Sequence, residues 1–191
     1  TAEVGVQMSV IERIYKTREL KKTLEESRGR LYRIAYSWCH DPALADDLVQ
    51  ETLVKALKNS HQLRDPNTVR SWLYRILTHC WRDHFRRLRE TVDIDDMVLA
   101  EENTPELNHD RLEVVERVRD AFATLSVGQR QVITLVDLEG CSYIEVAEIL
   151  EIPIGTVMSR LCRARRALKD ILLAAEEAPA ADAAPRLRRV K

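Results

Sequence analysis

The segment that decides the fold is CSYIEVAEILEIPIGTVMSRLCRARRAL, residues 141–168. Ser142 can cap a first helix, and Glu145 at the third helical position completes a capping box. Residues 151–155 contain a proline and form a short turn, after which Thr156 is expected to open a second helix. Two helices joined by so short a turn are typical of a helix-turn-helix, whose second helix enters the major groove of duplex DNA.

Each helix of this motif is expected to have an apolar and a polar face. In the first helix, the residues expected to face inward are Ile144, Ala147, Ile149 and Leu150. In the second helix, spacing by four, three and four predicts a buried stripe of Val157, Leu161, Ala164 and Leu168. The other face carries residues that can contact bases and phosphates, namely Thr156, Ser159, Arg160, Arg163 and Arg166. A plain surface helix with solvated arginines is the alternative, and the capped corner with its proline favours DNA binding.

The composition indicates an all-α protein. The 191 residues include five glycines and two phenylalanines, and long segments rich in Leu, Ala, Glu, Arg and Lys run in periods of three and four. The length suits one domain or two small ones. Because the formal net charge is −1, attraction to nucleic acid has to come from local clusters of basic residues.

The cysteines stand singly along the chain, at positions 39, 80, 141 and 162, without a CxxC pair. This usage is typical of free, mostly buried thiols in a reducing compartment. Cys80 and His84 lie four apart and could share a metal, but no second pair stands near them in sequence, so we predict neither a metal nor a cofactor. We recognise no signal peptide and no apolar run of membrane length, and we expect a cytoplasmic protein.

The first sixty residues predict three helical segments. Residues 9–26 are charged and weakly amphipathic, and residues 28–39 form a short helix with one apolar side. Pro42 introduces a further helix from Ala43. The exposed face of that helix is polar and mostly acidic: Asp46, Asp47, Gln50, Glu51 and Lys55. The loop of residues 61–68 follows, and its final threonine is the expected cap of the next helix.

The helix expected from Val69 to about Arg89 has an unusual exposed side. Steps of four, three, four and three align a row of cations: Arg75, His79, Arg82, Arg86 and Arg89. A second row at the same steps consists of Tyr74, Thr78, Trp81 and Phe85. Cations beside aromatic faces suit single-stranded nucleic acid, whose unpaired bases stack on rings. The alternative, that Trp81 and Phe85 belong to the core or to a protein interface, is equally open at this point.

The composition changes abruptly after Leu88. Seven residues from 90 to 108 are acidic and none is basic, which predicts an acidic linker. Helix is expected to resume near Pro105 or Asp110, and a further helix is expected over residues 127–138. The basic, proline-containing C-terminal tail is expected to be disordered.

Together these motifs resemble those of bacterial extracytoplasmic-function (ECF) sigma factors, which keep only the second and fourth sigma domains. DDLVQETLVKAL at residues 46–57 resembles the family's core-polymerase-binding segment. RSWLYRILTHCWRDHFRR at residues 70–87 resembles its promoter-melting helix, and IPIGTVMSRLCRARRAL at residues 152–168 its upstream-element reader. Three matches in order make the resemblance specific, whereas a helix-turn-helix alone occurs in many repressors.

The resemblance implies sigma domain 2 at residues 9–89, the acidic linker at 90–109, sigma domain 4 at 110–175 and a tail at 176–191. It implies that the clamp helices of the polymerase's largest subunit bind a set of acidic and amide side chains: Asp46, Asp47, Gln50 and Glu51. It implies minus-ten recognition and melting by Leu63, Arg64, Asn67, Tyr74, Arg75, His79, Trp81, Arg82 and Arg86. The family's minus-ten loop captures a flipped base. His79 stands where the family often has Asn, so the resemblance does not specify which base is captured.

For the minus-thirty-five element, the resemblance implies contacts from Thr156, Met158, Ser159, Arg160, Arg163 and Arg166. Met158 stands where Lys or Arg is common in the family. One contact to DNA is therefore expected to be missing or apolar. The acidic linker resembles the segment that threads toward the polymerase's active-site cleft, where its negative charge imitates nucleic acid.

The predicted function is that of an ECF sigma factor for a stress or metal-response regulon, with no catalytic residue, no cofactor and no small-molecule substrate. Its expected partners are core RNA polymerase, through the clamp helices and the flap region, promoter DNA, and an anti-sigma factor that we expect to be membrane-tethered.

Two alternative functions are weighed against this one. A self-sufficient helix-turn-helix repressor or activator usually dimerises, and the sequence has no obvious dimerisation heptad. A hydrolase or metal enzyme would have to be built around His79, Cys80 and His84, or around His40 and Asp41. The sequence has no glycine-rich phosphate loop and no nucleophile elbow to support it.

Overall fold

Helices make up the regular structure of this protein. The computed structural model describes residues 2–63, 65–91 and 118–177, and no strand occurs among them. The all-α prediction is therefore confirmed for these residues, and none of their helices is both long and apolar enough to cross a membrane. Most of the predicted linker, the predicted helix start near residue 105 or 110, Arg64 and the tail from residue 178 lie outside the described residues.

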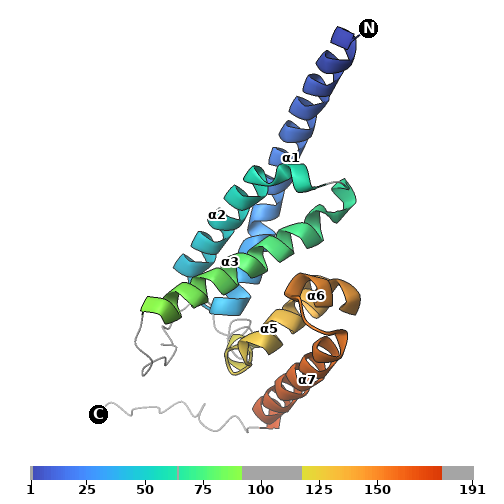
Figure 1. The fold of residues 1–191 in the computed structure, drawn as a ribbon. Helices are drawn as coiled ribbons and strands as arrows, with labels where there is room; N and C mark the ends of the chain where they lie inside the picture. The colour runs from blue at the N-terminus through green and yellow to red at the C-terminus, as the bar shows by residue number, and fades with distance from the viewer. Residues whose placement is uncertain (1, 64, 92–117, 178–191) are drawn as a thin grey trace, which may run out of the picture.

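Three long helices form the N-terminal part of the molecule (Figure 1): α1 (Ala2–Cys39), α2 (Pro42–Lys58) and α3 (Val69–Thr91). The Asp41 carboxylate accepts hydrogen bonds from two backbone amides of the first turn of α2, at 2.8 and 3.1 Å. Because this cap precedes a proline in the first turn, the sequence fixes the start of α2 as predicted. α2 then packs against both α1 and α3.

α1 is one continuous helix where the sequence predicts two segments, residues 9–26 and 28–39. Gly29 is the weakest helix former at the junction, and a glycine inside a helix costs about 1 kcal/mol relative to alanine. Packing offsets this cost, because Leu24 before the junction and Leu31 after it are both buried.

The connection from α2 to α3 consists of two 3-10 turns, η1 (Ser60–Gln62) and η2 (Pro66–Thr68). The sequence predicts Thr68 as the cap of α3, and this is wrong. Asp65 caps the second turn instead, because its carboxylate accepts a hydrogen bond from the amide of Asn67 at 2.9 Å. The second turn then continues directly into α3.

One face of each long helix builds the N-terminal core. Its side chains that are at most 2% exposed include Leu31, Ile34, Ala35, Trp38, Leu48, Val49, Ala56, Leu73 and Leu77. Leu73 and Leu77 belong to the apolar stripe of α3 and lie at the helical spacing of four. Burial of these aliphatic and aromatic side chains holds α1, α2 and α3 together.

The C-terminal part is a helix-turn-helix supported by further helices. A helical stretch at 118–123 precedes α5 (Val127–Ile133), the π-helical turn η3 (Thr134–Leu138), α6 (Tyr143–Leu150) and α7 (Ile154–Glu177). α7 packs on α5 and α6. This packing buries most of the predicted stripe of α7: Val157, Leu161 and Ala164. The helix-turn-helix prediction is confirmed.

The backbone at both ends of α6 explains the corner of this motif. Gly140 before α6 has a φ of +67°, and Glu151 after it has a φ of +49°, so left-handed residues turn the chain on both sides. The Ser142 hydroxyl accepts from the amide of Glu145 at 3.2 Å, and the Glu145 carboxylate accepts from the amide of Ser142 at 2.7 Å. The predicted capping box is thus confirmed, and its hydrogen bonds hold the pKa of Glu145 below its ordinary value.

Two predictions for this motif are wrong in detail. α7 begins at Ile154, so Thr156 is its third residue and does not open the helix. Ile144 is 64% exposed and does not face inward. The inward stripe that contains the buried Ile149 passes through Val146, one helical step of three away, and Ile144 lies off that stripe.

The cysteines are all free thiols, as predicted. Cys80 and Cys141 are buried, Cys39 is half-buried and Cys162 is exposed. Burial raises the pKa of the first three. A thiol with a raised pKa stays protonated near neutral pH, so these three side chains behave as small apolar residues.

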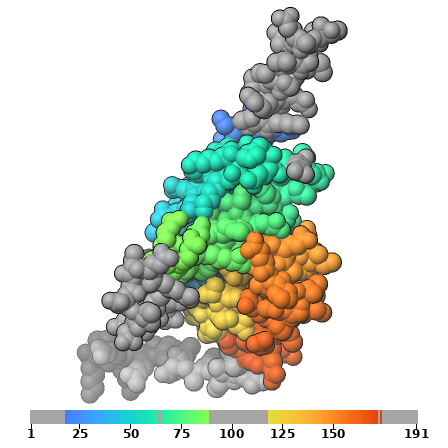
Figure 2. All heavy atoms as spheres, viewed as in Figure 1, coloured from blue at the N-terminus to red at the C-terminus, as the bar shows by residue number. Residues whose placement is uncertain are grey.

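The N-terminal and C-terminal parts pack directly against each other. α3 lies beside α6 (Figure 1), and α1 contacts α5 and η3. The surfaces of the two parts meet over a broad area in Figure 2. The hydroxyl oxygens of Ser37 in α1 and Thr134 in η3 lie 3.0 Å apart, and the buried side chains of both parts form one contiguous cluster. The fold therefore places the helix-turn-helix next to the cation-bearing helix α3.

The capping box gives a direct test of the corner. Ser142→Ala removes the side chain that binds an otherwise unpaired amide, and it should lower the free energy of unfolding by about 1 kcal/mol. Ser142→Thr keeps a capping hydroxyl and should stay close to wild type. Urea denaturation followed by circular dichroism measures both, and equal stability of the two variants would contradict the capping role.

Candidate nucleic-acid interface

One edge of α3 carries exposed basic side chains, namely Arg75, His79, Arg82 and Arg86. They recur at steps of four, three and four, so the helical period places them in a single row. Their predicted exposure is confirmed, whereas their contact with DNA stays a prediction. The side chain of residue 89 lies outside the described residues.

The aromatic row beside these cations does not lie on the surface. Tyr74 is 1% exposed and Trp81 is 6% exposed. Trp81 packs edge-on against Trp38 of α1, with ring centroids 5.9 Å apart, and Phe85 packs on Trp81 at 4.4 Å. Of the two interpretations left open by the sequence, the structure therefore supports the one in which Trp81 and Phe85 belong to the core, and it contradicts an exposed aromatic platform. The row lies between the cations and the apolar stripe of α3, and packing against α1 draws it into the core.

A carboxylate of the C-terminal part, Glu151, pairs with two side chains of the α3 row. Arg82 donates to a carboxylate oxygen of Glu151 at 2.5 Å and also to the backbone carbonyl of Leu150. The Nε2 atom of His79 lies 3.2 Å from the other carboxylate oxygen. The hydrogen bond from Arg82 is the main reason that the pKa of Glu151 lies below its ordinary value. Glu151 is thus firmly ionised beside the proposed DNA-binding edge.

A second carboxylate, Glu139, lies among basic groups of α1 and α3. The Tyr74 hydroxyl donates to it, and nitrogens of Arg70 and Arg30 lie 3.2 and 3.7 Å from the same oxygen. The side chain of Glu139 is 11% exposed. Burial, followed by the hydrogen bond to Glu139, raises the pKa of Tyr74 to about 12. The phenol therefore remains a hydrogen-bond donor at neutral pH.

The loop before α3 holds the other residues predicted for minus-ten recognition. Leu63 is half-buried and Asn67 is exposed, while Arg64 lies outside the described residues. The amide of Asn67 is bound to Asp65, which fixes the backbone of the second turn and leaves the Asn67 side chain at the surface. The structure thus brings this loop to the N-terminal end of the cation row.

The predicted DNA-reading face of α7 is partly exposed. Met158 is 53% exposed, and Arg163 and Arg166 are also exposed, whereas Thr156 and Ser159 are half-buried. Neighbouring groups already hold several of these side chains. The Ser159 hydroxyl donates to the Thr156 carbonyl at 3.1 Å, and Arg163 donates to the Ser159 carbonyl at 3.3 Å. These contacts follow the axis of α7 and orient the side chains along one face.

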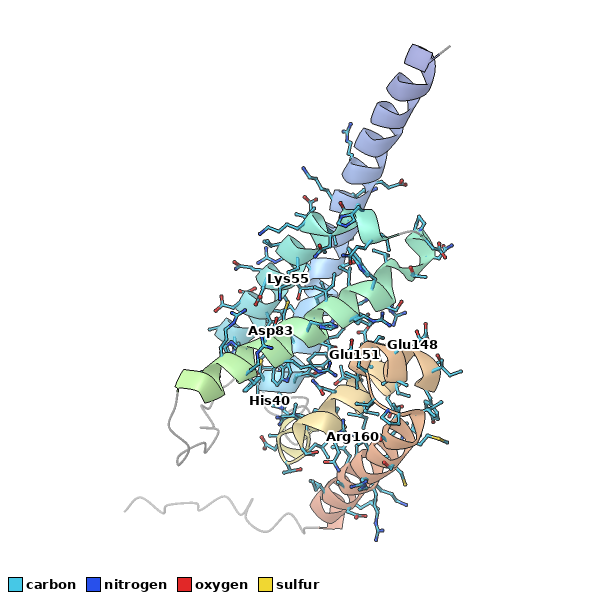
Figure 3. The ribbon with its side chains drawn as sticks, in the orientation of Figure 1. His40, Lys55, Asp83, Glu148, Glu151 and Arg160 are labelled. Atoms are coloured by element: carbon cyan, nitrogen blue, oxygen red, sulfur yellow. The ribbon has the colours of Figure 1, made fainter. Side chains whose placement is uncertain are left out.

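Arg160 differs from the other members of this face. It is half-buried and its guanidinium lies against Gly128 of α5, where an added Cβ would meet a terminal nitrogen at 2.9 Å. A glycine at this point lets the arginine pack closely on α5. Arg160, labelled in Figure 3, therefore contributes to packing between α5 and α7.

The predicted polymerase-binding face of α2 is mostly exposed. Asp47 and Gln50 are exposed, and Asp46 is exposed with a nitrogen of Arg28 at 3.5 Å. Glu51 is half-buried and pairs with Lys55 at 3.0 Å, and a nitrogen of Arg87 lies at 3.6 Å. All four predicted side chains lie on α2, but the Glu51 carboxylate already forms ion pairs with Lys55 and Arg87.

Sequence reasoning missed the carboxylates that pair with α1 and α3. Glu139 and Glu151 are each 69 residues from an arginine that binds them, and no local pattern joins residues so far apart. Asp137 likewise accepts a hydrogen bond from Arg165 of α7 at 3.0 Å. The sequence does place a glutamate near each end of α6, and turns at helix ends expose side chains to distant partners. This position was the signal that could have pointed to the two carboxylates.

The residues of the enzyme alternative have different surroundings. His79 is exposed and pairs with Glu151, whereas Cys80 is buried. Across the described ranges, no group of three or more His, Cys, Asp or Glu residues is placed to hold a metal ion. The structure therefore adds no support for a catalytic or metal centre at these residues.

Two family models match the chain. The model for Sigma-70 region 2 matches residues 23–91, and the model for Sigma-70, region 4 matches residues 115–168. The first range contains the cation row of α3, and the second contains the helix-turn-helix.

The chain is also similar to named sigma factors. It is 34% identical over 154 residues to ECF RNA polymerase sigma factor SigE of Mycolicibacterium smegmatis, an alignment that covers 78% of this chain and 60% of SigE. It is 34% identical over 128 residues to ECF RNA polymerase sigma factor EcfG of Rhodopseudomonas palustris, covering 67% of this chain and 71% of EcfG. The RNA polymerase sigma-H factor of Pseudomonas aeruginosa is 32% identical over 145 residues, covering 70% of this chain and 75% of that protein.

Two solved structures share the fold. One is the sigma factor RpoE in complex with the anti-sigma factor NepR from Bartonella quintana, with a TM-score of 0.64, 27% identity, and coverage of 82% of this chain and 98% of that chain. The other is CnrH in complex with the cytosolic domain of CnrY, with a TM-score of 0.57, 30% identity, and coverage of 82% and 89%.

The ion pair between Lys55 and Asp83, 3.2 Å long, joins α2 to α3 (Figure 3) and makes a pH-dependent contribution to stability. The hydrogen bond from Lys55 holds the pKa of Asp83 below its ordinary value. A carboxylate whose pKa is lower in the folded state adds stability above its unfolded pKa, about 4, and this stability is lost as the pH falls through the folded pKa. Asp83→Asn should therefore lower the free energy of unfolding at neutral pH.

The expected loss is about 0.2 to 1 kcal/mol, because the pair is partly exposed. Urea denaturation at neutral pH and below about pH 4 measures it, and the difference from wild type should shrink toward zero at the lower pH. Lys55→Met and the double variant complete a double-mutant cycle. A coupling of zero at neutral pH would mean that the pair adds nothing.

Proposed function

The chain belongs to the ECF family of RNA polymerase sigma factors, and from that premise we propose that it guides core RNA polymerase to promoters and helps to open the DNA there. One observation carries the proposal: a helix-turn-helix and a second helix with a row of exposed cations occur on the same short chain. A self-sufficient repressor needs only the helix-turn-helix. The second helix suits the added task of holding a separated strand.

We assign minus-ten recognition to the loop before α3 and to the cation row, with the members Leu63, Arg64, Asn67, Arg75, His79, Arg82 and Arg86. The cations neutralise phosphates of the separated strand. Leu63 and Asn67 belong to the loop to which the family resemblance assigns capture of an unpaired base. We do not assign Tyr74 and Trp81, which the resemblance also implies for minus-ten recognition, because both side chains are buried.

We assign recognition of the minus-thirty-five element to α7, with the members Thr156, Met158, Ser159, Arg160, Arg163 and Arg166. Arginine suits bidentate contact with guanine or contact with phosphate. The exposed Met158 offers an apolar surface, which favours contact with a thymine methyl group over a phosphate. Of these residues, Arg163 combines exposure with a central position on the face.

We assign polymerase binding to the acidic face of α2, with the members Asp46, Asp47, Gln50 and Glu51, and we take a basic surface on the clamp helices as its partner. The polymerase performs the chemistry, so the chain needs no catalytic residue. The proposed division is sigma domain 2 at 9–89, a linker at 90–109, sigma domain 4 at 110–175 and a tail at 176–191. The flap region of the polymerase is the proposed partner of domain 4.

We further propose that a protein inhibitor controls this factor. RpoE was solved with the anti-sigma factor NepR, and CnrH with the cytosolic domain of CnrY. An inhibitor tethered to a membrane would pass a stress or metal signal from outside to a cytoplasmic sigma factor. Such an inhibitor would act by covering the surfaces that bind DNA or polymerase.

Reconstitution with core RNA polymerase tests the proposal. The purified chain should bind core polymerase and start transcripts downstream of shared upstream motifs in a library of promoter fragments. Asp47→Lys should abolish polymerase binding, because it places a cation opposite a basic partner, without loss of helicity. Glu25→Lys makes the same charge change at an exposed position of α1 and should bind as wild type. Absence of both polymerase binding and shared start sites would favour a self-sufficient repressor.

Arg163 tests the upstream reader separately. Arg163→Ala should weaken binding to the mapped upstream element by about 1 to 3 kcal/mol, the range for one arginine contact to a base. Lys169→Ala removes an exposed cation from the same helix and should have a smaller effect that does not depend on sequence. Fluorescence anisotropy with the specific duplex and a scrambled one separates these results, and an unchanged affinity for Arg163→Ala would remove that residue from the reader.

A further inference from the structure

A pocket with a volume of about 470 Å³ lies between α1, α3 and η3. Three of the side chains that line it are arginines, namely Arg30 and Arg33 of α1 and Arg70 of α3. We call it the arginine pocket. Its volume falls within the range of about 300 to 1,000 Å³ that small-molecule sites occupy. None of its three arginines belongs to the surfaces assigned above to promoter DNA or to polymerase, so the proposed function gives this pocket no role.

The arginine pocket carries more positive charge than its own lining balances. Of the lining residues that the structure describes, Glu139 alone is acidic, which leaves a surplus of two positive charges. One Glu139 oxygen lies 3.2 Å from a nitrogen of Arg70 and 3.7 Å from a nitrogen of Arg30. Arg33 is exposed and forms no hydrogen bond or ion pair with any residue that the structure describes. The pocket therefore favours an anion.

The guanidinium groups of the pocket keep unused donors. The Nε atom of Arg70 donates to the Tyr74 hydroxyl at 3.0 Å, and one of its terminal nitrogens donates to Glu139 at 3.2 Å. A guanidinium has five N–H donors in a fixed fork, which matches pairs of oxygens on a phosphate group. Arg70 can therefore bind a phosphate oxygen through its other terminal nitrogen without losing either contact.

The remaining lining assigns recognition to the arginines and offers an apolar contact. The Ser37 hydroxyl donates to the Ile34 carbonyl at 2.8 Å, so the Thr134 hydroxyl, 3.0 Å from that of Ser37, spends its proton on Ser37. Thr134 lines the pocket but has no proton left for a ligand. Leu138, another lining residue, is 64% exposed. Its side chain gives the organic part of a ligand a surface to pack on.

The arrangement of the arginines favours a compact ligand over a strand of nucleic acid. Arg30 and Arg33 lie one helical step of three apart on α1, and Arg70 reaches the same cavity from α3. Donors that converge on one cavity are typical of a small-molecule site. The cations of the α3 row are instead spread along a helix edge, as the phosphates of a strand require.

We propose that the arginine pocket binds a small molecule that carries a diphosphate group. Arg30, Arg33 and Arg70 donate to the phosphate oxygens, and Leu138 contacts the organic part. A diphosphate offers oxygens to several arginines at once, and its negative charge offsets the surplus of the pocket. Nucleoside diphosphates and inorganic pyrophosphate share this group. The proposal goes beyond the proposed function and does not rest on it.

Calorimetric titration of the full chain with pyrophosphate, ADP and GDP at constant ionic strength tests the pocket. Arg33→Gln should weaken binding by about tenfold or more, because it removes charge-assisted hydrogen bonds to the phosphate. The fold should persist, since Arg33 has no partner among the described residues. Arg18→Gln makes the same charge change at an exposed position of α1 outside the pocket and should bind as wild type.

Thermal unfolding supplies a second measurement on the same proteins. A ligand that binds only the folded protein raises the melting temperature as its concentration rises. Pyrophosphate should produce this rise in wild type and in Arg18→Gln, and a much smaller one in Arg33→Gln. Circular dichroism before heating checks that each variant keeps its helices.

Leu138→Ser distinguishes the two sources of the diphosphate group. If ADP and GDP bind more tightly than pyrophosphate and Leu138→Ser removes only that difference, the ligand is a nucleoside diphosphate whose organic part contacts Leu138. If all three probes bind equally and Leu138→Ser changes none of them, the diphosphate group alone is recognised and the contact with Leu138 is refuted.

Three results would overturn the pocket as a small-molecule site. The first is that neither pyrophosphate, ADP nor GDP binds the wild type at millimolar concentration. The second is that Arg33→Gln and Arg18→Gln lose the same affinity, which would indicate general charge attraction. The third is that an oligonucleotide displaces pyrophosphate from the wild type and itself binds Arg33→Gln more weakly, which would make the pocket part of a nucleic-acid surface. Failure to bind core polymerase would refute the proposed function and leave these results unchanged.

Discussion

Two carboxylates, Glu139 and Glu151, determine how the N-terminal and C-terminal parts of this protein meet. Burial of apolar side chains supplies most of the favourable free energy between the parts, but apolar surfaces alone do not select one orientation. The glutamates do, because each has to reach a cluster of donors on α1 or α3. Ion pairs at a partly exposed interface contribute little net stability, but they favour one relative orientation of the two surfaces. The ion pairs therefore fix the geometry of an interface whose stability comes mainly from apolar burial.

The formal net charge of −1 conceals a strong segregation of charge. Cations lie along one edge of α3 and on the outer face of α7, while α2 presents exposed acids. Each surface is thus suited to a partner of opposite charge, nucleic acid for the first two and a basic protein surface for the third. Glu139 and Glu151 use the same complementarity within the molecule. Arg82 and His79 pair with Glu151 in this structure, and the proposed function assigns the same two side chains to the promoter strand.

Local features of this fold were predictable from sequence, because their causes lie within a few residues. The capping box of Ser142 and the cation row of α3 follow from side-chain chemistry and helical period. The burial of Trp81 was not predictable, since a row beside an apolar stripe can face either solvent or a neighbouring helix, and contact with Trp38 decides between them. The ion pairs of Glu139 and Glu151 were not predictable either, because their partners are brought together by the packing of both parts and not by sequence spacing.

The distance between the two parts in solution tests their packing against each other most directly. Spin labels at the exposed Cys162 of α7 and at Lys58→Cys of α2, with the half-buried Cys39 replaced by alanine, report this distance by pulsed electron paramagnetic resonance. The free protein should give one narrow distribution, because a contiguous apolar core and the ion pairs of Glu139 and Glu151 hold the two parts in one arrangement. A broad distribution in the free protein would contradict this packing.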